Sequence, residues 1–190
     1  MDGIASWYER LAFRWAFRQA VAQGRPEFTG RISGEVVIPE DREGRPGYRL
    51  TTAGTSTAIR ACAGYGKTTD FNLGTGQRSR LLGTCNGRME GSLEARADVA
   101  VKHALDQHGA SGVTCVVEPH ASHLAGEDAI SYRLEVTRGP LAGLTITDSI
   151  FDHDGWCFTA GAFNAPDDGP ASHEMAAAIL ASWAWLPRQR

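Results

Sequence analysis

A string of small residues that ends in lysine and threonine is the part of the sequence most similar to a catalytic motif. It begins at Ala61 and reads ACAGYGKT, which fits the relaxed pattern of a phosphate-binding loop with alanine in place of the first glycine. In such a loop the backbone amides cradle phosphates, Lys67 would pair with them, and Thr68 would hold magnesium. A nucleotide-binding enzyme that uses residues 61–68 is therefore one hypothesis.

The residues around this string favour a different interpretation. A phosphate-binding loop needs a buried strand before it and an apolar helix that starts at its lysine. Residues 54–60 are polar and end in arginine, and residues 69–76 contain Asp, Asn and Gly, which do not sustain a helix. We therefore interpret residues 61–68 as a chance turn sequence and keep nucleotide binding as an alternative.

Two groups of histidines and carboxylates have the residue types that bind metal ions. His120 and His123 flank one expected loop, and the Asp-His-Asp run at 152–154 occupies another. Imidazole nitrogens and carboxylate oxygens are ordinary zinc ligands. Nothing in the spacing fixes the distance between the two groups, and polar residues are usual in turns. We expect solvated loops, with no metal and no cofactor.

The sequence contains no recognisable catalytic nucleophile. It has no GxSxG elbow, and its cysteines form no CxxC pair. Three of the cysteines lie in apolar or strand-like runs, which favours buried free thiols. These three are Cys62, Cys115 and Cys157, and the fourth cysteine is Cys85. The sequence therefore favours a protein that is not an enzyme.

The first 24 residues combine aromatic and arginine side chains at helical spacing, and a helix is predicted over 3–22. Tryptophan and arginine are frequent anchors at protein interfaces, so this helix could dock onto a partner protein. It could also lie in a membrane surface or cover the chain's own sheet. The candidate partner-binding residues are Trp7, Arg10, Arg14, Trp15 and Arg18.

The rest of the chain predicts an antiparallel sheet and two more helices. One helix is expected over 93–108 with Ser92 as its N-cap, and a last one after the N-cap Ser172, carrying Trp183 and Leu186 and ended by Pro187. Helices segregated on an antiparallel sheet define an α+β fold, here an α/β/α sandwich with an extra N-terminal helix. Strands are expected over 32–38, 48–52, 57–62, 67–73, 80–84, 113–118, 129–137, 144–151 and 156–163.

Length and charge limit the organisation and the partners. The 190 residues predict one α+β domain over 25–190, after the helix of residues 1–24. The formal net charge is −3, which argues against nucleic acid as a partner. Residues 1–100 carry fourteen basic and eleven acidic side chains, and residues 101–190 carry five and eleven. No export signal or membrane-length apolar run is recognised, so we expect a cytoplasmic protein.

Residues 93–186 carry a resemblance to a known fold. The features are the strand at 144–151, the hairpin into GWCFTAGAF at 155–163, and the closing ILASW at 179–183. Together with the order of elements, these resemble the Mog1/PsbP-like α/β/α fold, which includes DcrB- and LpqN-type bacterial proteins. The N-terminal helix and residues 40–90 depart from that pattern, because they are longer and more irregular.

The resemblance implies a non-enzymatic accessory or adaptor role, in which another protein is bound through a sheet face or loops. A protein partner and no cofactor is therefore the leading hypothesis. The alternatives are a nucleotide-binding enzyme that uses residues 61–68 and a peripheral membrane protein attached through residues 3–22.

Overall fold

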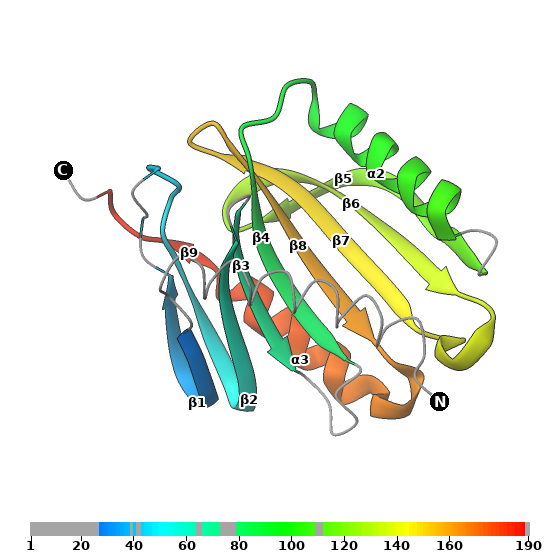
Figure 1. Cartoon of the computed structure of the whole chain (residues 1–190), viewed down its shortest axis with the longest axis horizontal. Helices are drawn as coiled ribbons and strands as arrows, with labels where there is room; N and C mark the ends of the chain where they lie inside the picture. The colour runs from blue at the N-terminus through cyan, green and yellow to red at the C-terminus, as the bar shows by residue number, and fades with distance from the viewer. Residues whose placement is uncertain are drawn as a thin grey trace.

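The computed structural model describes residues 27–38, 40, 43–63, 66–72, 79–108 and 112–188. In those ranges the chain forms an antiparallel sheet and two α-helices, which confirms the predicted α+β class (Figure 1). No helix within them is long and apolar enough to cross a membrane.

The predicted N-terminal helix lies outside the described residues. It and the boundary between 1–24 and 25–190 therefore stay predictions, as does the partner-binding role of Trp7, Arg10, Arg14, Trp15 and Arg18.

The sheet follows the order β1-β2-β3-β4-β8-β7-β6-β5, and a short strand, β9, pairs with β2. The junction between the earlier and later strands is the β4–β8 pair, in which Leu81 lies opposite Ala162 and Thr84 opposite Thr159. The strands are β1 Glu27–Ile38, β2 Tyr48–Ala63, β3 Gly66–Asn72, β4 Arg80–Gly87, β5 Val113–Leu124, β6 Glu127–Val136, β7 Thr145–His153, β8 Trp156–Asn164 and β9 Ala184–Trp185.

The two helices, α2 (Leu93–His108) and α3 (Gly169–Ala181), cover opposite faces of this sheet (Figure 1). Ile150 and Phe151 are neighbours on β7, so their side chains point to opposite faces. Ile150 belongs to the core cluster that includes Ala97 and Val101 of α2. Phe151 belongs to the cluster that includes Ile179 of α3. The sheet is therefore the middle layer of an α/β/α sandwich.

The core on the α3 side is built from aromatic rings. The ring of Trp183 stacks on that of Tyr48 with centroids 4.3 Å apart, and it meets Phe151 edge-on at 5.5 Å. Gly83 makes room for it, because a Cβ there would lie 3.1 Å from the indole. The rings of Phe151 and Phe158 stack at 5.8 Å. Such pairs add about 0.5–1.5 kcal/mol each beyond burial.

Helix 93–108 and its cap are confirmed. The helix spans Leu93–His108, and the backbone amide of Ala95 donates to Oγ of Ser92 at 3.3 Å. The predicted hairpin turn is also present: Asp154 and Gly155 join β7 to β8 with positive φ angles of 53° and 74°. These are the angles that favour Asp-Gly in a tight turn.

Two strand predictions are wrong in their extent. The pieces expected at 48–52 and 57–62 form one strand, β2, because β1 pairs along it and absorbs the irregularities by register shifts. The strand expected to end at residue 118 continues to Leu124, so His120 and His123 lie in a strand instead of flanking a loop. Pro119 does not end it because β5 is the last strand in the order, where a missing amide is tolerated.

The last helix was predicted too late in the chain. It begins at Gly169 with a proline in its first turn, so Ser172 is not its N-cap; the Ser172 hydroxyl donates to the Gly169 carbonyl at 3.0 Å. It ends at Ala181, and Trp183 and Leu186 follow it. The backbone amide of Thr51 donates to Oγ of Ser182 at 2.7 Å, which turns the chain onto β2.

We expect Trp183→Ala to lower the free energy of unfolding by about 3–5 kcal/mol, because it removes a 5 % exposed indole from the aromatic core. Urea denaturation measures the change, and Val99→Ala on the outer side of α2 is the control, with an effect under about 0.5 kcal/mol. Equal effects of the two substitutions would contradict this view of the core.

Candidate functional site

The structure places the phosphate-loop-like string in a β-hairpin. Ala61 pairs with Thr68, and Cys62 with Lys67, as antiparallel partners of β2 and β3. A phosphate-binding loop instead needs its lysine at the start of a helix, where the first amides point at the phosphates. The nucleotide-binding alternative is therefore wrong in its geometry, and the interpretation as a chance turn sequence stands.

The two groups of possible metal ligands are not brought together. The exposed His123 ring contacts Asp128 at 3.1 Å, and Nδ1 of His120 lies 3.0 Å from the carbonyl of Glu118. Asp152 and His153 are successive residues of β7, and so point to opposite faces. In the part of the chain that the structure describes, no three such side chains are grouped as a metal site.

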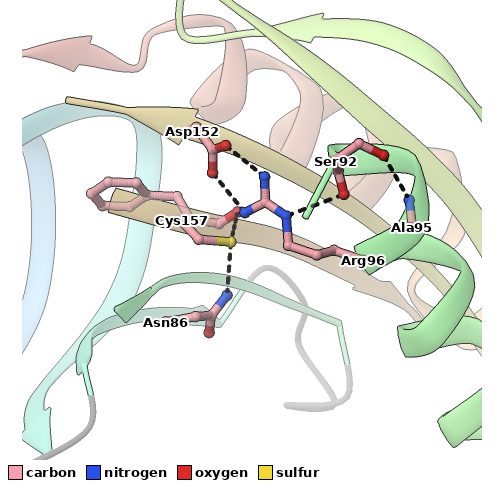
Figure 2. Close-up of polar contacts among 7 residues, drawn as sticks. Asn86, Ser92, Ala95, Arg96, Asp152 and Cys157 are labelled. Atoms are coloured by element: carbon pink, nitrogen blue, oxygen red, sulfur yellow. Dashed lines mark hydrogen bonds and ion pairs between the residues drawn. The ribbon is translucent and has the colours of Figure 1, made fainter. Parts of the chain in front are cut away.

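The first polar cluster on the sheet attaches the start of α2 to the β7–β8 hairpin (Figure 2). The guanidinium of Arg96 is 7 % exposed and forms a two-pronged pair with the carboxylate of Asp152, with nitrogen–oxygen distances of 2.8 and 2.5 Å. Its Nε also donates to the carbonyl of Ser92 at 3.3 Å. Charge-assisted pairs of this geometry are strong and directional. They fix the helix start relative to β7.

Cys157 lies beside this pair on β8. Its thiol is in contact with the side-chain amide of Asn86 at 4.0 Å (Figure 2). Asn86 also donates to Oγ1 of Thr159 at 2.6 Å. Burial raises the pKa of the Cys157 thiol, and the charge of Arg96 only partly offsets that effect. Because the thiolate is the reactive form, Cys157 is an inert part of the core. Burial also raises the pKa of Cys115.

The buried free thiol predicted at Cys157 is confirmed, whereas Cys115 is only half-buried. Cys85, which the sequence pattern did not mark as buried, is a buried free thiol as well. The side chain of Cys62 lies outside the described residues.

A second polar cluster crosses three strands on the α2 side. The hydroxyl of Tyr132 on β6 donates to Oδ2 of Asp148 on β7 at 3.0 Å. Asp148 lies opposite Gly161 of β8, where a Cβ would overlap Oδ1 of the carboxylate. Burial raises the pKa of Asp148 to about 6, and the bond from Tyr132 lowers it only in part. The pKa of Tyr132 is raised as well, first by burial and second by the charge of the neighbouring Asp148.

Sequence reasoning missed Arg96 and Asp148, although the pattern contained a signal for each. Asp148 lies on the α2-covered face of β7, between Ile146 and Ile150 on the same face. Arg96 adjoins Ala97 in the stripe of α2 that faces the sheet. A charged residue at a core-facing position needs a buried partner, but the sequence alone does not show which one.

The chain was compared with known proteins. No protein-family model matches it, and no curated protein does. A solved structure of cyanobacterial PsbP (CyanoP) from Synechocystis sp. PCC 6803 is similar, with a TM-score of 0.58 and 11% identity over 82% of this chain and 94% of that one. The chain has the Mog1/PsbP-like fold.

This likeness reaches beyond the predicted range of 93–186, because it covers most of the chain. The strands β1–β4, which looked irregular in sequence, belong to the same sheet as the later strands. LpqN, involved in cell envelope biogenesis of Mycobacterium tuberculosis, also aligns, with a TM-score of 0.38 and 12% identity over 85% of this chain and 83% of that one. At these identities the comparison concerns the fold alone.

We expect Arg96→Ala to destabilise the protein by about 2 kcal/mol, because it removes charge-assisted bonds but leaves Asp152 partly solvated. Thermal or urea unfolding measures it. Arg133→Ala is the matched control, because the guanidinium of Arg133 is exposed and donates to the hydroxyl of Thr147, which is not charged. An Arg96 effect as small as the control would show that the pair does not hold the helix.

We expect Asp148→Asn to stabilise the protein at alkaline pH. The folded pKa lies above the ordinary value of 3.8, at about 6, so the charge opposes folding and stability falls as pH rises through this interval. The amide removes that penalty of up to about 3 kcal/mol above pH 7, and the gain shrinks below about 1 kcal/mol near pH 4. Urea unfolding against pH measures it; a gain independent of pH would contradict the assignment.

Proposed function

We propose that the protein is a non-enzymatic accessory or adaptor protein that acts by binding another protein. The observation that carries the proposal is that the buried polar side chains of the two clusters are bonded to other parts of the fold. Shifted pKa values mark candidate catalytic groups, but structural networks shift them too. Here Arg96 is bound to Asp152, and Asp148 to Tyr132. These contacts fasten α2 to the sheet and β6 to β7, so they favour a structural role.

Two further points support a binding role. The fold is shared with CyanoP over nearly all of that chain, and the resemblance noted in the sequence implies accessory proteins. Fold likeness does not establish function, so the proposal also depends on a binding surface. We assign that surface to residues 1–24, where aromatic and arginine side chains of the kind that anchor interfaces alternate.

We further propose that the protein works in the cytoplasm of a bacterium and does not bind nucleic acid. The net charge of −3 supports the second point, since a concentrated basic surface drives nucleic-acid binding. Attachment of residues 3–22 to a membrane surface is the second candidate role. The alternation of tryptophan, phenylalanine and arginine in that segment favours it, because such residues suit a lipid interface.

We expect the double substitution Trp7→Ala and Trp15→Ala to weaken partner binding at least tenfold, because buried tryptophan anchors contribute about 2 kcal/mol or more each. The full-length protein is used to isolate a partner, which is then purified and titrated against both forms. Val99→Ala, on α2, is the control that keeps full affinity.

Equal affinity of the double variant and the control would remove residues 1–24 from the proposal. Failure of every form to bind a protein, together with flotation on anionic phospholipid vesicles that is lost in the double variant, would favour the membrane role instead. Urea midpoints of all forms are compared to exclude unfolding.

A further inference from the structure

Two arginine side chains lie over one tryptophan ring at the start of β8. Trp156 is the first residue of that strand, and it is buried. The guanidinium of Arg88 lies 4.9 Å from the centroid of its ring, and that of Arg45 lies 5.7 Å from it. Cations at this distance from an indole are attracted to its face. The ring therefore fixes two guanidiniums, one from the segment between β4 and α2 and one from the loop before β2.

The arginines around the β7–β8 hairpin differ in how their charges are balanced. The side chain of Arg45 is 10 % exposed and forms an ion pair with Glu43. At the tip of the hairpin, Arg188 donates to the carboxylate of Asp154 at 2.9 Å. Arg88 is exposed, and no carboxylate among the described residues contacts it. Of these three arginines, Arg88 is the one without a bonded carboxylate.

The guanidinium of Arg88 is held in place with its donors unused. A guanidinium carries five N–H groups, and the contact with Trp156 occupies none of them with an acceptor. Gly155 places no side chain beside it, since a Cβ there would lie 3.5 Å from Nη1 of Arg88. A side chain that is already held by a ring loses less rotamer freedom on binding than a free one. Arg88 is therefore prepared to bind an anion.

The residues beside Arg88 indicate which kind of anion fits. The planar fork of arginine matches a carboxylate or a phosphate with two parallel bonds. The next residue, Met89, is 51 % exposed, and arginine, methionine and aromatic residues are enriched at protein interfaces. The exposed Glu90 follows, so the surface is not a broad basic patch of the kind that attracts nucleic acid. An unpaired guanidinium next to an exposed apolar side chain favours a peptide that carries both carboxylates and an apolar residue.

We propose that Arg88, held on Trp156 and followed by the exposed Met89, is a docking site for an acidic segment of a partner protein. A carboxylate of that segment pairs with the guanidinium, and a neighbouring apolar side chain packs on Met89. The site rests on the proposed protein-binding role, but it is separate from residues 1–24. It adds to that role the chemistry of a second contact, in which the partner supplies negative charge.

The test is a titration of the isotope-labelled, full-length protein with the acetylated and amidated peptide Glu-Glu-Leu-Glu-Glu at low salt. Backbone amide NMR signals of Arg88, Met89 and Gly155 are followed, and we expect them to shift to saturation. Arg88→Gln should weaken the affinity about fivefold, the size of a well-oriented exposed ion pair. Arg133→Gln, which removes an exposed arginine on β6, is the matched control and should stay within about twofold.

Arg88→Lys separates the charge from the shape of the side chain. Lysine keeps the positive charge but has no planar fork and lies less well on an indole. We expect its affinity for the peptide to fall between those of the unaltered protein and Arg88→Gln. An affinity equal to that of the unaltered protein would contradict a site that depends on the guanidinium. Urea midpoints of both Arg88 variants are compared with that of the unaltered protein to exclude unfolding.

Three results would overturn the proposal. The first is that the unaltered protein shows no shifts at Arg88, Met89 and Gly155. The second is equal weakening by Arg88→Gln and Arg133→Gln, because the peptide would then respond to net charge alone. The third is that inorganic phosphate at the same concentration produces the same shifts, which would indicate an adventitious ion only.

The double variant Trp7→Ala and Trp15→Ala distinguishes this proposal from the partner-binding role of residues 1–24. We expect it to bind the peptide with unchanged affinity, because Arg88 and Trp156 are unaltered in it. Loss of peptide binding in the double variant would contradict a separate site. Peptide binding that is retained while the purified partner is lost would support both proposals.

Discussion

The pairing of β4 with β8 is the constraint on which the rest of the structure depends. It joins β1–β4 to β5–β7 in the sheet (Figure 1). β8 is buried along most of its length, with α3 on one face and the side chain of Asp148 against the other. The small residues Ala160, Gly161 and Ala162 allow α3 to pack closely on one face of β8 and the Asp148 side chain on the other. Larger side chains there would separate the layers, because a close-packed interior does not absorb extra volume.

The polar clusters follow from this two-sided burial. Where a helix covers the sheet, a charged side chain is shielded from water and needs a partner. Arg96 and Asp152 satisfy each other where α2 begins, and Asp148 accepts from Tyr132 at the cost of a raised pKa. Burial accounts for the raised pKa of Asp148, and burial together with the charge of Asp148 accounts for that of Tyr132.

Local patterns in the sequence were sufficient for the regular elements. The capped stripe of α2, the alternating strands of the second half and the Asp154-Gly155 turn are all determined by neighbouring residues. The predicted boundaries are wrong where contacts with residues distant in the sequence determine where an element begins or ends. Ser182 bonds to Thr51, which is 131 positions away, and turns the chain out of the helix that Trp183 and Leu186 would otherwise continue. β2 stays continuous because β1 lies beside it.

The candidate site was less predictable than the fold for the same reason. The inward positions of Arg96 and Asp148 are readable from periodicity, but Arg96 and Asp152 are separated by 56 positions, and only the strand order brings them together. The phosphate-loop string shows the reverse case. Its residue types match a catalytic motif, whereas its place in a hairpin of β2 and β3 rules out the geometry that the motif needs.

Native-state hydrogen exchange of the strand amides is the measurement that tests the central role of the β4–β8 pair most directly. We expect the hydrogen-bonded amides of Phe158–Ala162 and of their β4 partners to exchange slowest, and only through global unfolding, while those of β5, at the end of the strand order, exchange faster through local opening. Exchange of the β8 amides as fast as those of β5 would contradict it, since the two halves of the sheet would then separate without unfolding the protein.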